Sequence, residues 1–177
     1  MPQPPGQTTE ETFESFVAAR GDALWRSAWL LTGDSGRAED LVQTALAKAW
    51  PHWRRLSDPG RFEAYTRRVL FNTYVAWWRR RWNGERPTDV LPEPTANAPG
   101  DPDPDLRRDL MSALAELPRG QRAVVVLRYF EDRTEAETAE LLGISIGTVK
   151  SQTSRAMAAL RRSPALSQND QTPKDLP

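Results

Sequence analysis

The chain has no cysteine among its 177 residues and a single histidine, His52. The lack of cysteine excludes disulfides, thiolate metal sites and thiol redox sensing within this chain. The lone histidine lies beside Pro51, and no serine–aspartate pair or acidic ligand cluster is recognisably associated with it. There is likewise no glycine-rich phosphate loop. The sequence therefore predicts a protein that is not an enzyme and that holds neither a metal nor a cofactor.

Long apolar runs are also missing. No stretch approaches the roughly 20 apolar residues that a membrane span requires. The start of the chain, MPQPPGQTTEE, has neither the basic region nor the apolar stretch of a secretory signal. We therefore expect a cytoplasmic protein without membrane insertion. The length allows one domain or two small ones, and the composition is that of a soluble globular protein.

The chain also lacks net charge, since the formal count is zero. Taken alone, this argues against a protein that binds nucleic acid. The charges are segregated, however: residues 61–81 hold six arginines against Glu63, and residues 85–105 hold six acids against Arg86. Positive charge is thus concentrated on helices and negative charge on the connection between them.

Helical periodicity predicts an all-α fold of two small helical domains joined by a flexible acidic linker. Residues 1–10 are polar and proline-rich, and we expect them to be disordered. The first domain is predicted over 11–83, and the linker over 84–104, where six of 21 residues are proline. The second domain is predicted over 105–162, followed by a disordered tail over 163–177. All seven tryptophans precede the linker, so the first core should be aromatic and the second aliphatic.

A long helix is expected from about Phe62 to Trp82, after a turn-rich loop over 54–61. Its predicted buried side consists of Phe62, Tyr65, Val69, Thr73, Ala76 and Trp77. A second face interleaves arginines with Phe71, Tyr74, Val75 and Trp78. Two interpretations of this face stay open. Its aromatic rings could stack on unpaired bases while guanidinium groups hold phosphates, or the rings could pack inside their own domain.

Residues 134–162 have the pattern of a helix-turn-helix. Thr134 and Glu137 have the spacing of a capping box, Gly143 stands where the chain must turn, and Ser145 can cap the second helix. The predicted core side of that helix consists of Ile146, Val149, Thr153, Ala156, Met157 and Leu160. Elsewhere in this domain, Leu106, Leu127, Tyr129 and Ala136 are also expected in the core.

The opposite side of the second helix is basic and rich in hydroxyl groups, with four basic residues and no acid between Ser145 and Arg162. A face of this kind suits insertion into the major groove of DNA. The alternative is an ordinary helical hairpin with a solvated basic face.

Two helical domains and a linker, with an arginine- and aromatic-rich helix before a helix-turn-helix, resemble the extracytoplasmic-function sigma factors (group 4) of bacterial RNA polymerase. The resemblance covers residues 13–162. AEDLVQTALAKAW (38–50) is similar to the family's core-polymerase-binding helix, FEAYTRRVLFNTYVAWWRRR (62–81) to its −10 promoter helix, and EAETAELLGISIGTVKSQTSRAMAALR (135–161) to its −35 recognition module. The stretch over 67–82 is most similar to the SigE-like subgroup.

The resemblance implies an alternative sigma factor that binds core RNA polymerase and directs promoter-specific transcription initiation at −10 and −35 elements. The residues implied in core-polymerase binding are Asp40, Gln43, Glu39 and Thr44. Those expected to bind −10 DNA are Asn72 and the arginines of its helix, Arg67, Arg68, Arg79, Arg80 and Arg61, while the loop over 56–61 is expected to capture a flipped base. Those implied in −35 DNA binding are Thr148, Lys150, Ser151, Gln152, Ser154 and Arg155.

The chain departs from the family pattern at Gln152, where many relatives have arginine, at Thr138, a position that is usually aliphatic, and at Phe71, which replaces a common basic residue. The expected partners are core polymerase and promoter DNA, and the resemblance adds regulation by an anti-sigma factor, although no residue identifies one. We expect a monomer when the protein is free. The competing hypothesis is a conventional helix-turn-helix regulator, which would bind duplex DNA as a dimer without polymerase.

Overall fold

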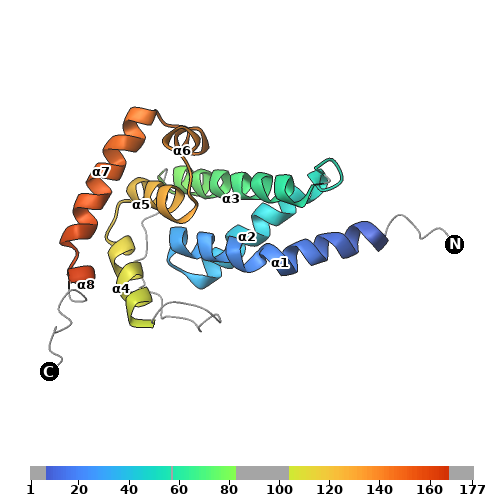
Figure 1. Ribbon diagram of the computed structural model, residues 1–177, viewed down its shortest axis with the longest axis horizontal. Helices are drawn as coiled ribbons and strands as arrows, with labels where there is room; N and C mark the ends of the chain where they lie inside the picture. Colours follow the sequence, from blue (N-terminus) through green and yellow to red (C-terminus); the bar gives the residue numbers. More distant parts are fainter. Residues whose placement is uncertain (1–6, 57, 83–103, 168–177) are drawn as a thin grey trace, which may run out of the picture. The chain divides into compact units, whose positions relative to one another are not determined.

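The computed structural model describes residues 7–56, 58–82 and 104–167, and all the regular secondary structure in these ranges is helical (Figure 1). The chain divides into two compact units, residues 1–89 and 90–177, which are described separately below. The predicted all-α fold of two helical domains is therefore confirmed. Of the predicted linker over 84–104, all but Pro104 lies outside the described residues.

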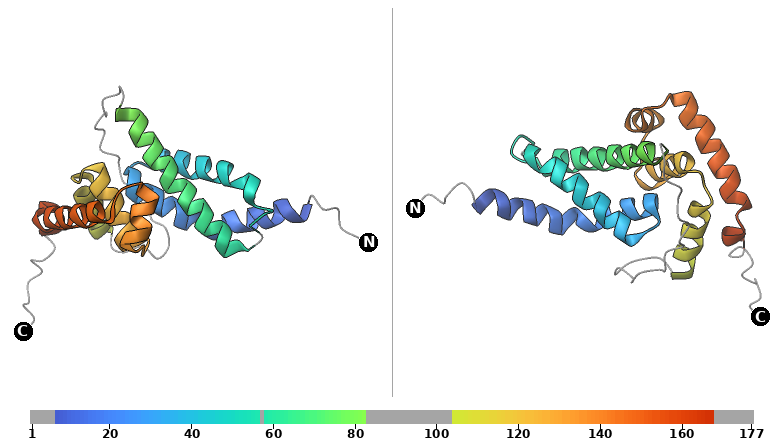
Figure 2. Two further views of the ribbon diagram at one scale, coloured as in Figure 1. Left: turned by 90° about the horizontal axis from the view of Figure 1, so that it is seen from above. Right: turned by 180° about the vertical axis from the view of Figure 1, so that it is seen from behind.

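The described residues of unit 1 form three long helices and one short 3-10 turn (Figures 1 and 2). They are α1 (Gln7–Thr32), α2 (Ser35–Ala49), η1 (Trp50–His52) and α3 (Pro59–Trp82). Helix α2 packs against both α1 and α3. Because α1 already begins at Gln7, the predicted disorder of residues 1–10 is wrong from that residue onward.

The predicted aromatic core of unit 1 is found in part: a cluster of rings packs beside a largely aliphatic remainder. Phe16, Trp53 and Phe62 are buried together, and Phe13 packs against them. The Trp53 and Phe62 rings meet edge to face, with centroids 4.7 Å apart, and those of Phe16 and Phe62 are 4.9 Å apart. Edge-to-face pairs of this kind contribute about 0.5–1.5 kcal/mol beyond the burial of their area. Helices α1 and α3 and the segment after α2 are thus held together by one ring cluster.

Helix α3 buries a wider arc than predicted because it packs against both α2 and α1. Phe71, Tyr74 and Val75, which were candidates for an exposed face, are only 2%, 7% and 8% exposed. The hydroxyl of Tyr74 donates a hydrogen bond to the carbonyl of Leu31 on α1 (3.2 Å). The hypothesis that these side chains stack on bases is therefore wrong, and packing inside the domain is the correct interpretation. Tyr65, Val69, Ala76 and Trp77, expected in the core, are half-buried.

The same helix also begins three residues earlier than predicted, at Pro59. A carboxylate oxygen of Asp58 accepts a hydrogen bond from the backbone N–H of Gly60 (3.2 Å). Proline suits the first turn of a helix because its missing N–H would be unsatisfied there in any case. The Asp58-Pro59 pair is therefore a start signal, and Arg61 belongs to the first turn of the helix rather than to a loop.

In the described residues of unit 2, three helices and a π-helical turn come before a longer helix, and a short helix follows it. These are α4 (Pro104–Ala115), α5 (Arg119–Val125), η2 (Val126–Phe130), α6 (Glu135–Leu142), α7 (Ile146–Arg162) and the short α8 (Pro164–Ser167). Helix α7 packs against α5 and α6, and α8 packs against α4 (Figure 1). The core is aliphatic, as predicted, and its largest fully buried side chains are Leu114, Leu127, Val124, Val126 and Val149.

Four side chains expected in this core are exposed instead. They are Leu106 at 42%, Tyr129 at 53%, Ile146 at 45%, and Ala136. For Tyr129 the reason is the π-helical turn, in which the N–H of Glu131 donates to the carbonyl of Val126 (3.0 Å) and the side-chain register shifts. Ile146 is the first residue of α7. The predicted disorder of the tail is also wrong as far as Ser167, because Ser163 is buried and α8 follows it.

Candidate nucleic-acid and polymerase interfaces

The turn between α6 and α7 has the local structure that its sequence predicts. The backbone N–H of Thr134 donates to Oε2 of Glu137 (2.8 Å), and the N–H of Glu137 donates to Oγ1 of Thr134 (3.2 Å), which completes the capping box. The hydrogen bonds that the Thr134 backbone N–H and, to a smaller extent, the Thr134 hydroxyl (2.9 Å) donate to the Glu137 carboxylate lower the pKa of Glu137 from its ordinary value of 4.5. Gly143 then turns the chain with a left-handed backbone, at φ 65° and ψ 38°. The helix-turn-helix prediction is confirmed in these details.

Helix α7 starts at a second cap and is anchored on one side. Ser145 Oγ accepts a hydrogen bond from the backbone N–H of Thr148 (3.1 Å). Val149 and Ala156 are fully buried, so this side of α7 faces α5 and α6. The opposite side is exposed and carries Lys150, Ser151, Ser154 and Arg155.

The other two candidates on α7, Thr148 and Gln152, are half-buried and lie toward the anchored side. The exposed group combines two cations with two hydroxyl groups, and both kinds of group can bond to phosphates and to base edges. One acid of the neighbouring helix reaches this face: Oε2 of Glu135, at the start of α6, lies 3.8 Å from Nζ of Lys150.

The candidate residues on α3 are divided between two sides of the helix. At about 100° per residue, Arg61, Arg68, Asn72 and Arg79 fall on one stripe along α3, and all four are exposed. We refer to them as the α3 stripe. Arg80 is also exposed but lies about 100° around the helix from Arg79. Three exposed guanidinium groups and one exposed amide thus share a line along α3, beside which Tyr65 is half-buried.

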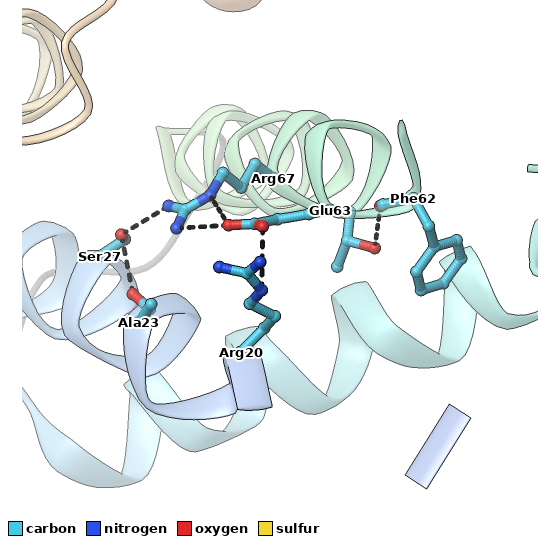
Figure 3. Close-up of polar contacts among 7 residues, drawn as sticks. Arg20, Ala23, Ser27, Phe62, Glu63 and Arg67 are labelled. Carbon is cyan, nitrogen blue, oxygen red and sulfur yellow. Dashed lines mark hydrogen bonds and ion pairs between the residues drawn. The ribbon is translucent and has the colours of Figure 1, made fainter. Parts of the chain in front are cut away.

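Arg67 lies on another side of α3 and faces α1 (Figure 3). Its Nε and Nη2 atoms lie 3.2 and 3.1 Å from Oε1 of Glu63, and its Nη1 atom donates to Ser27 Oγ on α1 (3.3 Å). Arg20 of α1 approaches the other oxygen of Glu63 at 3.3 Å. The Arg67 and Glu63 side chains are only 17% and 19% exposed. The structure therefore separates Arg67 from the α3 stripe and makes it a brace between α1 and α3.

Sequence reasoning missed Glu63 as the centre of this brace. Glu63 and Arg67 are four residues apart on one helix, a spacing that brings opposite charges together. This signal was present in the sequence, but the contribution of Arg20 and Ser27 from α1 could only come from the packing of the helices.

The candidates for polymerase binding lie on the side of α2 that faces away from the core. Glu39, Asp40 and Gln43 are exposed on this face, and Thr44 is half-buried at its margin. The buried side of α2 consists of Ala38, Leu41, Val42, Ala45 and Ala49. The structure thus brings three of the four candidates together as two carboxylates and one amide.

His52, the single histidine, is half-buried rather than a freely solvated turn residue. Its Nδ1 lies 3.3 Å from the hydroxyl of Tyr65, and the two ring centroids are 4.9 Å apart. Among the described residues, no three histidine or acidic side chains are grouped so that they could hold a metal ion. None of the helices in the described ranges is both long and apolar enough to cross a membrane.

Comparison with known proteins identifies the family to which these two units belong. Residues 16–84 match the family model for Sigma-70 region 2, and residues 107–160 match that for Sigma-70, region 4. The chain is 46% identical over 149 residues to the RNA polymerase sigma-E factor of Streptomyces coelicolor, covering 84% of each chain. It is 38% identical over 142 residues to the ECF RNA polymerase sigma factor SigL of Mycobacterium tuberculosis, covering 78% of this chain and 80% of the relative.

A solved structure agrees with this assignment. The sigma factor RpoE, in its co-crystal structure with the anti-sigma factor NepR from Bartonella quintana, matches with a TM-score of 0.67 and 26% identity. The match covers 89% of this chain and 98% of that chain. With a region 2 match in unit 1, a region 4 match in unit 2 and relatives of this identity, the chain belongs to the extracytoplasmic-function (ECF) family of RNA polymerase sigma factors.

Proposed function

We propose that this sigma factor directs promoter-specific transcription initiation through three separate helical faces. The exposed face of α2 binds core RNA polymerase, the α3 stripe contacts the −10 element, and the exposed face of α7 reads the −35 element. The observation that carries this proposal is the same in all three helices: each buries one side and has most of its candidate residues exposed on the other.

For the −35 element, the α7 face fits the major groove. Arg155 can donate two hydrogen bonds to a guanine edge, and Ser151 and Ser154 can bond either to bases or to phosphates. Lys150 supplies a point charge for a phosphate. Thr148 and Gln152 lie nearer the packed side, so they contribute at the margin of the face. Since Gln152 has no charge, it brings no ion pair to the backbone of the DNA.

For the −10 element, the α3 stripe supplies three guanidinium groups that can bond to successive phosphates of the DNA backbone. It also supplies the amide of Asn72, which can bond to a base edge. Arg80 can reach a phosphate from the side of this stripe. Arg67 acts indirectly, because its brace to α1 holds α3 in place. The start of α3 after Asp58 is proposed as the place where an extruded base is bound, since unstacking one base costs only about a few kcal/mol.

The proposed partners are core polymerase and promoter DNA, with an anti-sigma factor as regulator. Two relatives in solved structures support the last of these, because RpoE is bound there to NepR and CnrH to the cytosolic domain of CnrY. We propose that the free chain is a cytoplasmic monomer without catalytic activity, which changes the promoter choice of the polymerase and not its chemistry.

A pull-down with core polymerase, followed by transcription from genomic DNA in vitro, tests this function. The wild-type chain should bind core and yield promoter-dependent transcripts. Asp40→Ala should weaken the pull-down, whereas Asp22→Ala, an exposed acid of α1, should not. Arg155→Ala should reduce transcription by about tenfold, in line with the loss of one base contact worth 1–3 kcal/mol. The absence of any promoter-dependent transcript would rule out the proposal.

A gel shift separates this function from that of a conventional regulator. The free chain should bind duplex DNA weakly and as a monomer until core polymerase is added. Tight dimeric binding of the free chain to a two-fold symmetric site would favour the regulator instead.

A further inference from the structure

Glu135 brings a negative charge to the basic face of α7. It is the first residue of α6, and its Oε2 lies 3.8 Å from Nζ of Lys150. The Lys150 side chain is 64% exposed and that of Glu135 37% exposed, so the pair faces solvent. The other first-turn acid of α6, Glu137, is engaged with Thr134 in the capping box and lies 3.8 Å from Arg133. Glu135 is therefore the acid of this turn that reaches across to α7.

We propose that Glu135 restrains binding of the −35 module to DNA by occupying Lys150 in the free protein, in the place that a DNA phosphate takes in the complex. The inference rests on the proposed function of the α7 face. Binding of DNA to this face exchanges one ion pair for another at Lys150, and it also brings the Glu135 carboxylate close to the phosphate backbone.

This exchange lowers the affinity of the α7 face for DNA of any sequence, because Lys150 must give up one ion pair to form another. Sequence-independent affinity comes almost entirely from the neutralisation of phosphates by basic residues. A lysine that must first leave a carboxylate adds less to that affinity. The pair is exposed and its ammonium group sits on a flexible stem, so the exchange is readily reversible. Glu135 thus limits the binding of the free −35 module to the excess of non-promoter DNA.

The test measures binding of the full-length chain to a labelled 20-base-pair duplex of arbitrary sequence by fluorescence anisotropy, over a series of salt concentrations. Glu135→Gln should bind about threefold to tenfold tighter at low salt, in line with the removal of one ion pair and of its repulsion of DNA. The slope of log K against log salt should become steeper by up to about 0.9, the value for one added phosphate contact.

Glu140→Gln is the matched control, because it removes the same charge from an exposed position on another side of α6. Its effect should stay below about twofold, because Glu140 lies about 140° around α6 from Glu135. Equal effects of the two substitutions would overturn the proposal. Circular-dichroism melts of both variants show whether the fold is retained.

A double-mutant cycle identifies the residue through which Glu135 acts. In a Lys150→Gln background, Glu135→Gln should give a smaller gain than in the wild type, because the ammonium group that it releases is gone and only the repulsion between the carboxylate and DNA is removed. A gain as large as in the wild type would overturn the role of Lys150. Promoter-dependent transcription by the wild-type holoenzyme distinguishes the failures: if it is absent, the proposed function fails, whereas the salt titrations judge Glu135 separately.

Discussion

Helices α3 and α7 both carry candidate DNA contacts, but they are packed in different ways. Helix α3 packs against both α1 and α2, and rings such as Phe62, Phe71 and Tyr74 occupy its wide buried arc. Helix α7 is anchored through Val149 and Ala156 and leaves a broad side exposed. An arginine on α3 can therefore be either a surface group or a brace, as Arg79 and Arg67 show, whereas the basic residues Lys150 and Arg155 of α7 both remain exposed.

The largest expected effect tests whether the wide buried arc of α3 stabilises unit 1. Phe62 is fully buried and its ring contacts those of Phe13, Phe16 and Trp53. Phe62→Ala should reduce the free energy of unfolding of unit 1 by about 3–5 kcal/mol, as large-to-small changes of buried aromatic residues do. Urea unfolding followed by tryptophan fluorescence reports this unit alone, since all seven tryptophans lie within residues 25–82.

The control for this substitution is Phe130→Ala in unit 2. Phe130 is 44% exposed at the end of the π-helical turn. We expect the free energy of unfolding of unit 2, measured by amide hydrogen exchange because this unit has no tryptophan, to change by no more than about 0.5 kcal/mol, which is usual for surface positions. Comparable losses from the two substitutions would contradict the difference in packing between the units.

The next prediction tests the narrow stripe of α3. Arg79→Ala should lower the yield of promoter complexes formed by the holoenzyme by about tenfold, since a charge-assisted hydrogen bond contributes roughly 1.5–3 kcal/mol. Arg80→Ala should lower it by less than about threefold, because Arg80 lies about 100° away from the stripe. Heparin-resistant complexes counted on a gel provide the measurement. The reverse ranking would place the DNA on another side of α3.

The sequence predicted α7 better than α3 for a physical reason. On a helix packed on one side, 3.6-residue periodicity separates the buried face from the exposed one, and Val149 and Ala156 were placed correctly. On α3, apolar residues almost surround the helix, so periodicity could not tell which arc is buried, and Phe71 and Tyr74 were left open. The predictions for Tyr129 and Ile146 were wrong because a π-helical turn and a helix start change the register locally, and periodicity does not reveal such changes.

Local signals performed well because they need only neighbouring residues. The capping box of Thr134 and Glu137, the left-handed Gly143 and the cap at Ser145 were all predicted from spacing and are all present. Contacts between helices could not be predicted in this way. Arg20 and Ser27 contact residues of α3 only because of how α1 packs against it. The same packing makes Arg67 a largely buried brace rather than a surface group.

Valine substitution of two buried threonines should change stability by a smaller amount, with opposite signs in the two units. The hydroxyl of Thr138 in unit 2 is buried and has no hydrogen-bond partner among the described residues. Thr138→Val should therefore stabilise unit 2 by about 1 kcal/mol, because an unsatisfied polar group is replaced by a methyl group of similar shape. Thr66 of unit 1 is also fully buried, but its hydroxyl donates to the carbonyl of Phe62 (2.8 Å).

Thr66→Val should accordingly destabilise unit 1, again by about 1 kcal/mol. Amide hydrogen exchange followed by mass spectrometry resolves the two units in one sample and provides the measurement. Equal signs for the two valine substitutions would mean that the hydroxyl groups do not differ in hydrogen bonding as described.

The smallest expected effect concerns the pH dependence of the turn in unit 2. Hydrogen bonds from Thr134 lower the folded-state pKa of Glu137 below its ordinary value of 4.5. A carboxylate of this kind stabilises the fold at pH values above its unfolded-state pKa, and the contribution disappears as the pH falls through the folded-state pKa. Glu137→Gln should therefore melt below the wild type at pH 7, and the difference between the two melting temperatures should shrink as the pH falls below about 4.5.

Thr134→Ala provides the matched test of this pH dependence, because it removes the hydroxyl group of the cap and leaves the carboxylate in place. In that background the pH-dependent difference caused by Glu137→Gln should be reduced, and circular dichroism at 222 nm would measure it. A difference that stays constant from pH 7 to pH 3 would show that Glu137 stabilises α6 without its charge. In that case a neutral hydrogen bond, rather than a carboxylate at the helix start, would account for the stability of the first turn of α6.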